Sequence, residues 1–96
     1  MPRAFVYILV SKRNGTLYTG ITSDLHGRIQ AHREGRGSKF VKKYGATRLV
    51  WFEEYPLYAD AIQRETSLKR WKRDWKLALI EEMNPDWNDL LETWNS

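Results

Sequence analysis

The sequence predicts an α+β fold in which a small three-stranded antiparallel sheet, in β-β-α-β-α order, is flanked by helices and followed by an extra C-terminal helix. Two short runs rich in β-forming residues, 5–10 and 17–21, lie on either side of a polar turn. A third such run covers residues 48–55. Helical spacing of apolar residues follows the second and third runs, at residues 25–34 and 57–83.

The first two strands are expected to form a hairpin, because Asn14-Gly15 is a strong turn signal. A two-residue loop would pair Arg13 with Thr16, whereas a four-residue loop would pair Ser11 with Thr16. Sequence alone leaves both registers open.

Both registers place two tyrosines and a glycine, Tyr7, Tyr18 and Gly20, on one face of the sheet. In the four-residue register Gly20 lies opposite Tyr7, and Tyr18 is the diagonal neighbour of Tyr7. We expect a glycine beside two hydroxyls to leave room for a nucleic-acid backbone, which makes Gly20 a candidate contact.

The helix at residues 25–34 has N-cap candidates before it and glycines after it. Leu25 and Ile29 should dock on the sheet, which places Arg28 and His32 at the border of the buried face. The guanidinium of Arg28 suits phosphate oxygens, although a surface ion pair is the alternative. His32 is a candidate proton carrier or phosphate donor, or else a helix-end histidine with a structural role. The flanking residues are Thr22, Ser23, Asp24, Gly35, Gly37.

A short helix is predicted from the cap Ser38 through Tyr44, with Gly45 ending it. Phe40 and Tyr44 lie four residues apart, so they either anchor this helix to the core or stack on nucleic-acid bases. In the third strand, Val50 and Phe52 should share one face, and Leu49 and Trp51 the other. The candidate phosphate contacts in the short helix are Lys39, Lys42, Lys43.

The helical pattern over residues 57–83 is long for so small a domain, so we expect a bend or break near residues 68–73. Glu65 lies at the edge of its apolar arc and needs a partner, which is either a divalent cation or a basic side chain, namely Arg64, Lys69 or Arg28. The arc consists of Ala61, Leu68, Trp71, Trp75, Leu79. The basic residues beside Glu65, which extend the candidate phosphate-binding surface, are Lys69, Lys72, Arg73, Lys76.

The chain is expected to form a single domain, with a core over residues 4–85 and a C-terminal helix over residues 85–94. Asn84-Pro85-Asp86 should cap that helix, which packs on the domain or mediates self-association. A monomer is the default expectation. The apolar side of the C-terminal helix is supplied by Leu90, Leu91 and Trp94.

Charge is unevenly distributed along the 96 residues. Residues 1–48 hold ten Lys or Arg against two acids, whereas residues 49–96 hold six against ten. This asymmetry favours a basic face for a polyanion such as nucleic acid. The chain has no cysteine, no apolar run approaches a membrane span, and the N-terminus does not resemble a secretory signal, so a cytoplasmic protein is expected.

The order of these residues resembles the GIY-YIG nuclease superfamily, in particular its small stand-alone bacterial members, over about residues 4–85. The two named tripeptides read Phe5-Val6-Tyr7 and Tyr18-Thr19-Gly20 here. Further matching residues follow the strands, namely Thr22, Asp24, Leu25, Arg28, Ile29, His32, Glu65. The first tripeptide departs from the pattern, since it lacks the glycine and the isoleucine. An asparagine soon after the metal glutamate is also missing, because the nearest later one is Asn84.

The resemblance implies an endonuclease that hydrolyses DNA phosphodiester bonds with one divalent metal ion, Mg²⁺ or Mn²⁺, held by Glu65. It implies that Arg28 stabilises the phosphoryl charge and that Tyr7 is the first candidate for the base. Tyr18 would relay protons or orient the water, and His32 is the alternative proton acceptor. The products would carry a 5′-phosphate and a 3′-hydroxyl.

The expected substrates are single-stranded or branched DNA with weak sequence specificity, in DNA repair, recombination or processing, because the chain has no length for a separate recognition domain. RNA is a second possible substrate. A non-catalytic nucleic-acid-binding module on the same fold is the main alternative. A small RNA-associated protein and a protein-interaction adaptor are further alternatives, and the adaptor leaves the candidate site residues unexplained.

Overall fold

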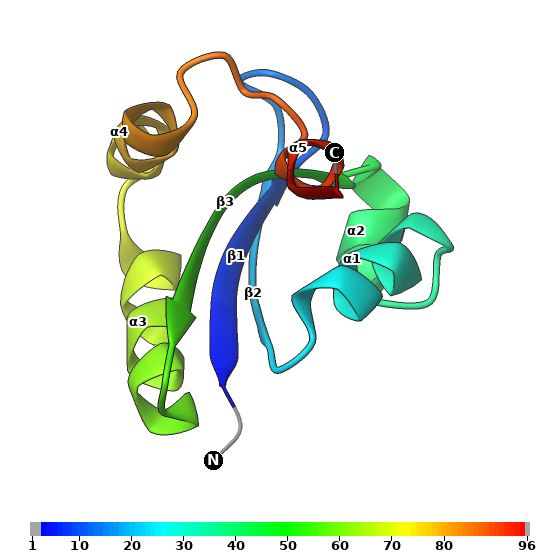
Figure 1. The fold of residues 1–96 in the computed structure, drawn as a ribbon. Coiled ribbons are helices and arrows are strands. Elements are labelled where there is room, and N and C mark those ends of the chain that lie inside the picture. Colours follow the sequence, from blue (N-terminus) through cyan, green and yellow to red (C-terminus); the bar gives the residue numbers. More distant parts are fainter. Residues whose placement is uncertain (1–2, 96) are drawn as a thin grey trace.

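The computed structural model describes the chain from residue 3 to residue 95, with side chains through residue 92. Its sheet contains β1 (Ala4–Val10), β2 (Leu17–Thr22) and β3 (Arg48–Tyr55) in the order β2-β1-β3 (Figure 1). Both pairings are antiparallel, and β1 is the central strand. Nearly every residue of β1 is buried, as expected for an apolar strand covered on both faces.

Helices cover both faces of this sheet (Figure 1). On one face lie α1 (Leu25–Arg33) and α2 (Lys39–Tyr44), and on the other lie α3 (Tyr58–Arg70) and α4 (Arg73–Met83). The last helix, α5 (Leu90–Asn95), contacts β3. This arrangement confirms the predicted α+β class, the strand order along the chain and the extra C-terminal helix.

The hairpin between β1 and β2 adopts the four-residue register. The Ser11 N–H donates a hydrogen bond to the Thr16 carbonyl at 3.2 Å, and Tyr7 lies opposite Gly20. Asn14 has a φ of 60°, a left-handed conformation that asparagine tolerates better than most residues. Turn chemistry therefore sets the register that brings the tyrosine face of β1 against the glycine of β2.

A bulge in β3 overturns the predicted faces of that strand. Trp51 lies opposite Ile8, but the next pair along β1 involves Leu49, so Val50 is the extra residue. Val50 and Trp51 consequently pack on the same face, toward α3 and α4, whereas Phe52 packs on the α1 face with Leu49. The prediction that Val50 and Phe52 share a face was wrong, because strict alternation holds only for an unbroken ladder.

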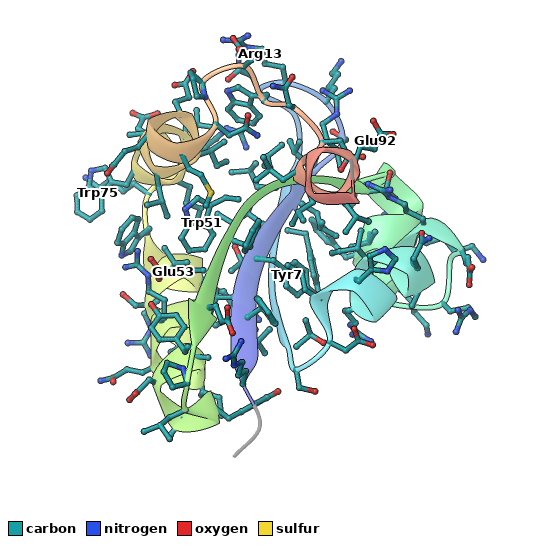
Figure 2. All side chains as sticks on the ribbon, viewed as in Figure 1. Tyr7, Arg13, Trp51, Glu53, Trp75 and Glu92 are labelled. Atoms are coloured by element: carbon teal, nitrogen blue, oxygen red, sulfur yellow. The ribbon has the colours of Figure 1, made fainter. Side chains whose placement is uncertain are left out.

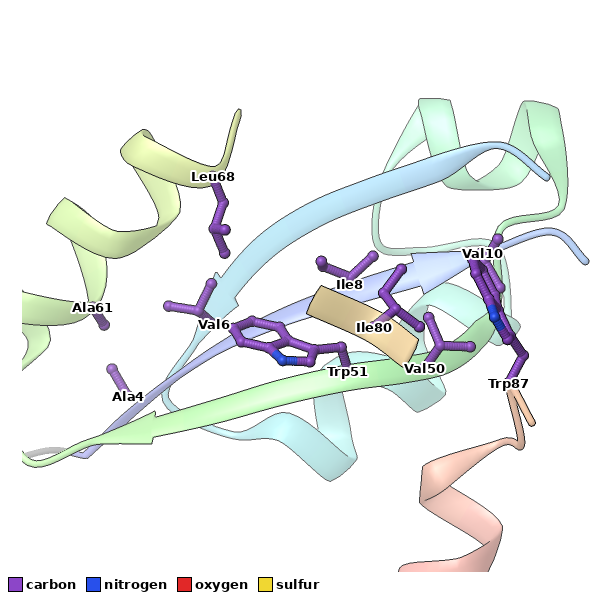
Figure 3. Close-up of a cluster of buried hydrophobic side chains, with 10 residues drawn as sticks. All are labelled: Ala4, Val6, Ile8, Val10, Val50, Trp51, Ala61, Leu68, Ile80 and Trp87. Atoms are coloured by element: carbon purple, nitrogen blue, oxygen red, sulfur yellow. The ribbon is translucent and has the colours of Figure 1, made fainter. Parts of the chain in front are cut away.

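The core on the α3 and α4 face combines side chains from β1, β3, α3 and α4 with Trp87 (Figure 3). Trp51 and Ile80 lie over the sheet there, and Trp87 closes the end near Val10. The buried residues of this cluster are Ala4, Val6, Ile8, Val10, Val50, Trp51, Ala61, Leu68, Ile80, Trp87. The smaller cluster on the opposite face contains Tyr7, Leu9, Leu25, Ile29, Val41, Ala46, Leu49, Leu91.

The expected break in the long helical segment falls at Trp71 and Lys72, whose backbone is extended. Beyond the break the apolar arc drawn for a continuous helix no longer applies. Trp75 is 57% exposed and points away from the sheet (Figure 2), and Ile80 is the buried residue of α4. Two extended residues shift the helical phase, which is why the arc failed at Trp75.

The predicted cap of the final helix was also placed too early. Asn84 instead ends α4, and its buried amide donates hydrogen bonds to the carbonyls of Val50 at 3.2 Å and Asn88 at 2.9 Å. The α5 N-terminus is held by Asp89, whose carboxylate accepts from the Leu91 N–H at 3.1 Å. Leu91 is buried, in agreement with packing on the domain, while the side chain of Trp94 lies outside the described residues.

Truncation of Leu68 should destabilise the fold because this side chain is completely buried between α3 and the sheet. We expect Leu68→Ala to lower the free energy of unfolding by about 2–5 kcal/mol in urea titrations followed by circular dichroism. Ile62→Ala is the matched control on the same helix, since Ile62 is 47% exposed and should cost less than about 1 kcal/mol. Equal losses for the two variants would contradict this description of the core.

Candidate active site

Three of the predicted site residues meet on the α1 face of the sheet. The Tyr7 hydroxyl lies 3.0 Å from Nε2 of His32, and both side chains are buried. The Tyr18 ring completes the group, with its centroid 6.4 Å from the Tyr7 ring and 5.5 Å from the His32 ring. Figure 2 shows Tyr7 on the side of α1 and Trp51 on the opposite side. The central strand β1, the edge strand β2 and the helix α1 thus each supply one of the three rings.

Gly20 has a different role from the one expected. A Cβ atom at this position would lie 2.4 Å from the Tyr7 hydroxyl oxygen, so the Tyr7 ring occupies the space above the glycine. That space is therefore closed to a nucleic-acid backbone, and the proposed Gly20 contact is corrected to an internal one. Gly20 lets Tyr7 lie flat across β2 toward His32.

Gly37 contacts the ring of His32, the second member of the Tyr7–His32 pair. The sequence did not indicate this contact. A Cβ atom there would lie 2.3 Å from Nδ1 of His32. The only available signal was a second glycine after α1, which we interpreted as a helix stop. Within the described residues, Nδ1 of His32 is buried without a hydrogen-bond partner.

Burial decides the protonation of the histidine. It lowers the pKa of His32, and the positive charge of Arg28 lowers that pKa further. The imidazole is therefore neutral at neutral pH, with one nitrogen as donor and the other as acceptor. If Nε2 accepts the Tyr7 hydroxyl hydrogen, the ring proton resides on Nδ1.

Burial also dominates the titration of Tyr7. It raises the pKa of Tyr7 to about 12, against the lowering effect of a side-chain hydrogen bond with Arg28. Electrostatic interactions with Tyr18 and Glu65 raise this pKa further, and the charge of Arg28 lowers it. Arg28 favours ionisation of Tyr7, but it does not make Tyr7 a phenolate at neutral pH.

Glu65 approaches the site from α3, on the other face of the sheet. Helix α3 contacts both β1 and the edge strand β2, and the charge of Glu65 acts on the Tyr7 hydroxyl. The Glu65 side chain is only 15% exposed and forms an ion pair with Lys69 at 3.4 Å. Arg64, another partner considered from the sequence, instead pairs with Glu53 at 3.1 Å.

The described residues contain no group of three or more acidic or histidine side chains arranged to hold a metal ion. A single carboxylate nevertheless suits Mg²⁺, which usually retains several waters and accepts substrate phosphate oxygens as ligands. Glu65 fits this role because it is largely buried and its ion-pair partner Lys69 is exposed enough to turn away. Mn²⁺ accepts the same oxygen ligands.

The candidate phosphate-binding residues divide into two groups. Arg73 donates hydrogen bonds to the carbonyls of Asn14 and Gly15, both at 2.6 Å, and so anchors the hairpin loop. Lys76 lies beside Arg73 and is half-buried, and its pKa is lowered by burial and by the Arg73 charge. The remaining lysines are exposed, namely Lys39, Lys42, Lys43, Lys69, Lys72.

Comparison with known proteins agrees with this geometry. Residues 3–78 match the family model described as the GIY-YIG catalytic domain, and the chain belongs to this nuclease family. The predicted resemblance is confirmed. A nuclease domain acts on nucleic acid, and GIY-YIG nucleases generally use a divalent metal ion. No helix among the described residues is both long and apolar enough to cross a membrane.

More particularly, similar proteins include several UPF0213 proteins. The chain is 39% identical over 82 residues to the UPF0213 protein of Staphylococcus aureus strain Mu3. The aligned segment covers 85% of this chain and 99% of that protein. The same values hold for UPF0213 protein SAV0488 of strain Mu50. The solution NMR structure of UPF0213 protein BH0048 from Bacillus halodurans is 31% identical with a TM-score of 0.57, covering 92% of this chain and 93% of that chain.

The neutral, buried His32 should make folding sensitive to mild acid. Because its pKa is lowered in the folded state, the unfolded chain binds more protons below about pH 6.5. The free energy of unfolding should therefore fall as the pH drops from about 6.5 toward about 5, and His32→Gln should reduce that slope. Urea titrations at several pH values measure the slope of the free energy of unfolding against pH. The exposed His26 provides the control, since His26→Gln should retain the slope; loss of the slope in this control would contradict the assignment.

Proposed function

We propose that this protein is a metal-dependent endonuclease that hydrolyses DNA phosphodiester bonds, leaving a 5′-phosphate and a 3′-hydroxyl. The observation that supports it most is the hydrogen-bonded Tyr7–His32 pair under the influence of both Arg28 and Glu65. These four residues supply a hydroxyl, a neutral imidazole, a fixed positive charge and a carboxylate. Hydrolysis of a phosphodiester requires groups of these kinds.

The charged residues would act on the phosphate. Arg28 lies close enough to the Tyr7 hydroxyl to lower its pKa through a hydrogen bond, so a phosphate at that hydroxyl would also be near the guanidinium. There Arg28 would stabilise the negative charge that grows on the phosphoryl oxygens. A divalent cation held by Glu65 would neutralise charge on the scissile phosphate and its leaving oxygen.

The raised pKa of Tyr7 argues against a free phenolate as the base. We propose a relay in which the Tyr7 oxygen takes a proton from the attacking water while its own proton passes to Nε2 of His32. The water oxygen bonds to phosphorus, the bond to the 3′-oxygen breaks, and that oxygen takes a proton from solvent. His32 can accept because burial keeps it neutral, and Tyr18 beside both rings would orient the water.

Single-stranded or branched DNA with weak sequence specificity is the proposed substrate, and repair, recombination or processing is the proposed setting. The monomeric state and a cytoplasmic location stay predictions from the sequence. The domain arrangement, with a core at residues 4–85 and an appended helix, is likewise proposed.

A non-catalytic nucleic-acid-binding module is the second candidate, and one observation favours it. The ion pair with Lys69 satisfies Glu65 without any metal. Metal-independent binding with no cutting by the wild-type protein would select this alternative.

Removal of the Glu65 charge tests the enzyme directly. We expect wild-type protein to cut labelled DNA with Mg²⁺ or Mn²⁺ but not with EDTA, and Glu65→Gln to lower the rate by about 100-fold or more. Single-stranded, duplex and branched DNA and RNA should be compared. Glu54→Gln is the control, because Glu54 pairs with Arg3 at the far end of β3 and should leave cutting unchanged. Equal cutting by Glu65→Gln would remove the metal assignment.

The proton relay predicts matched losses for its two members. Tyr7→Phe and His32→Gln should each lower the cutting rate by about 10²–10⁴-fold, since each breaks the same proton path. The double variant should lose little more than either single variant. Rate measurements at saturating metal decide this, and additive losses would show that the two residues act independently.

A further inference from the structure

Two large aromatic side chains of α2 lie at the surface. Phe40 is 41% exposed and Tyr44 is 45% exposed, and their ring centroids are 4.8 Å apart. The buried residue of α2 is Val41, which anchors the helix in the cluster beneath α1. The sequence left two roles open for the aromatic pair, and the structure shows that Val41 supplies the buried anchor.

The exposed rings continue inward to the candidate active site. The Phe40 ring lies 5.8 Å from the Tyr18 ring, and Tyr18 lies 6.4 Å from Tyr7. An unbroken series of rings therefore runs from the surface of α2 to the Tyr7–His32 pair. A group stacked on Phe40 would therefore sit next to Tyr18, and a group stacked on Tyr44 would sit one ring further out.

The surroundings of this aromatic pair are positive. Residues 35–48 contain five Lys or Arg residues and no acid. Among the described residues no carboxylate pairs with Lys39, Lys42 or Lys43, and the Lys43 ammonium lies 5.3 Å from the centre of the Tyr44 ring. Exposed aromatic side chains interleaved with lysines that pair with no carboxylate suit a polyanion whose repeating units carry flat rings.

We infer that Phe40 and Tyr44 form a stacking platform for unpaired bases of single-stranded DNA, with Lys39, Lys42 and Lys43 contacting its backbone. This inference rests on the proposed function, which supplies DNA as the substrate. In a duplex, stacking between neighbouring base pairs covers the base faces, so only a single strand can offer them to Phe40 and Tyr44. The ring series then leads the strand from α2 to the scissile position.

Binding without metal tests the platform separately from catalysis. Fluorescence anisotropy in EDTA should compare a labelled oligothymidylate with a duplex hairpin of equal charge. We expect Phe40→Leu and Tyr44→Leu each to weaken oligothymidylate binding by about tenfold, because leucine keeps apolar bulk but removes the flat ring. Duplex binding should change less than about twofold. Tyr58→Leu is the matched control, since Tyr58 is 38% exposed at the start of α3 and should bind like wild type.

The lysines give a second measurement. Each of Lys42→Gln and Lys43→Gln should reduce the slope of log affinity against log salt by about 0.7 for a single strand. Unchanged slopes would remove these lysines from the interface.

The outcomes separate the platform from the nuclease assignment. Unchanged oligothymidylate binding by folded leucine variants would overturn the platform, as would equal losses on oligothymidylate and duplex. Tighter binding of oligouridylate than of oligothymidylate would overturn the choice of DNA. A selective single-strand loss in a protein that cuts nothing would support the platform and reject the nuclease. Circular dichroism verifies that each variant is folded.

Discussion

The hydrogen bond between the Tyr7 hydroxyl and Nε2 of His32 joins the central strand to the first helix, and the candidate site is built around it. It requires that Tyr7 cross the edge strand, which only a glycine opposite it permits, and that α1 present His32 at its buried border. The hairpin register provides the first condition. Docking of Leu25 and Ile29 provides the second. A shift of one residue in either element would separate the two rings.

The same burial that fixes this contact determines its chemistry. Removing water from around Tyr7 and His32 disfavours both charged forms, so the pKa of the tyrosine rises and that of the histidine falls. Tyr7 is then not suited to act alone as a base at neutral pH, whereas the neutral His32 can accept a proton. Passing one proton through the pair avoids a buried phenolate, and this is why a relay suits the geometry better than a single tyrosine base.

Basic residues serve two different purposes in this molecule. Several arginines hold distant segments together: Arg33 contacts Asp89, Arg64 lies over Trp51 and Trp71, and Arg73 holds the hairpin loop. The lysines of α2 make no such internal bridges among the described residues. A net basic composition therefore overstates the surface available for nucleic acid, and the distinction between the two groups supports the proposed interface at α2.

The sequence by itself determined the strands, the caps of α1 and α2, a break within residues 68–73 and the shared face of Tyr7 and Tyr18, because these depend on local turn chemistry and on periodicity within an element. Only the tertiary structure decided what depends on contacts between distant segments. The bulge at Val50 changed which face Trp51 occupies. The approach of Gly37 to His32, the capping of α4 by Asn84 and the exposure of Phe40 all follow from how elements pack, which no pattern along one element encodes.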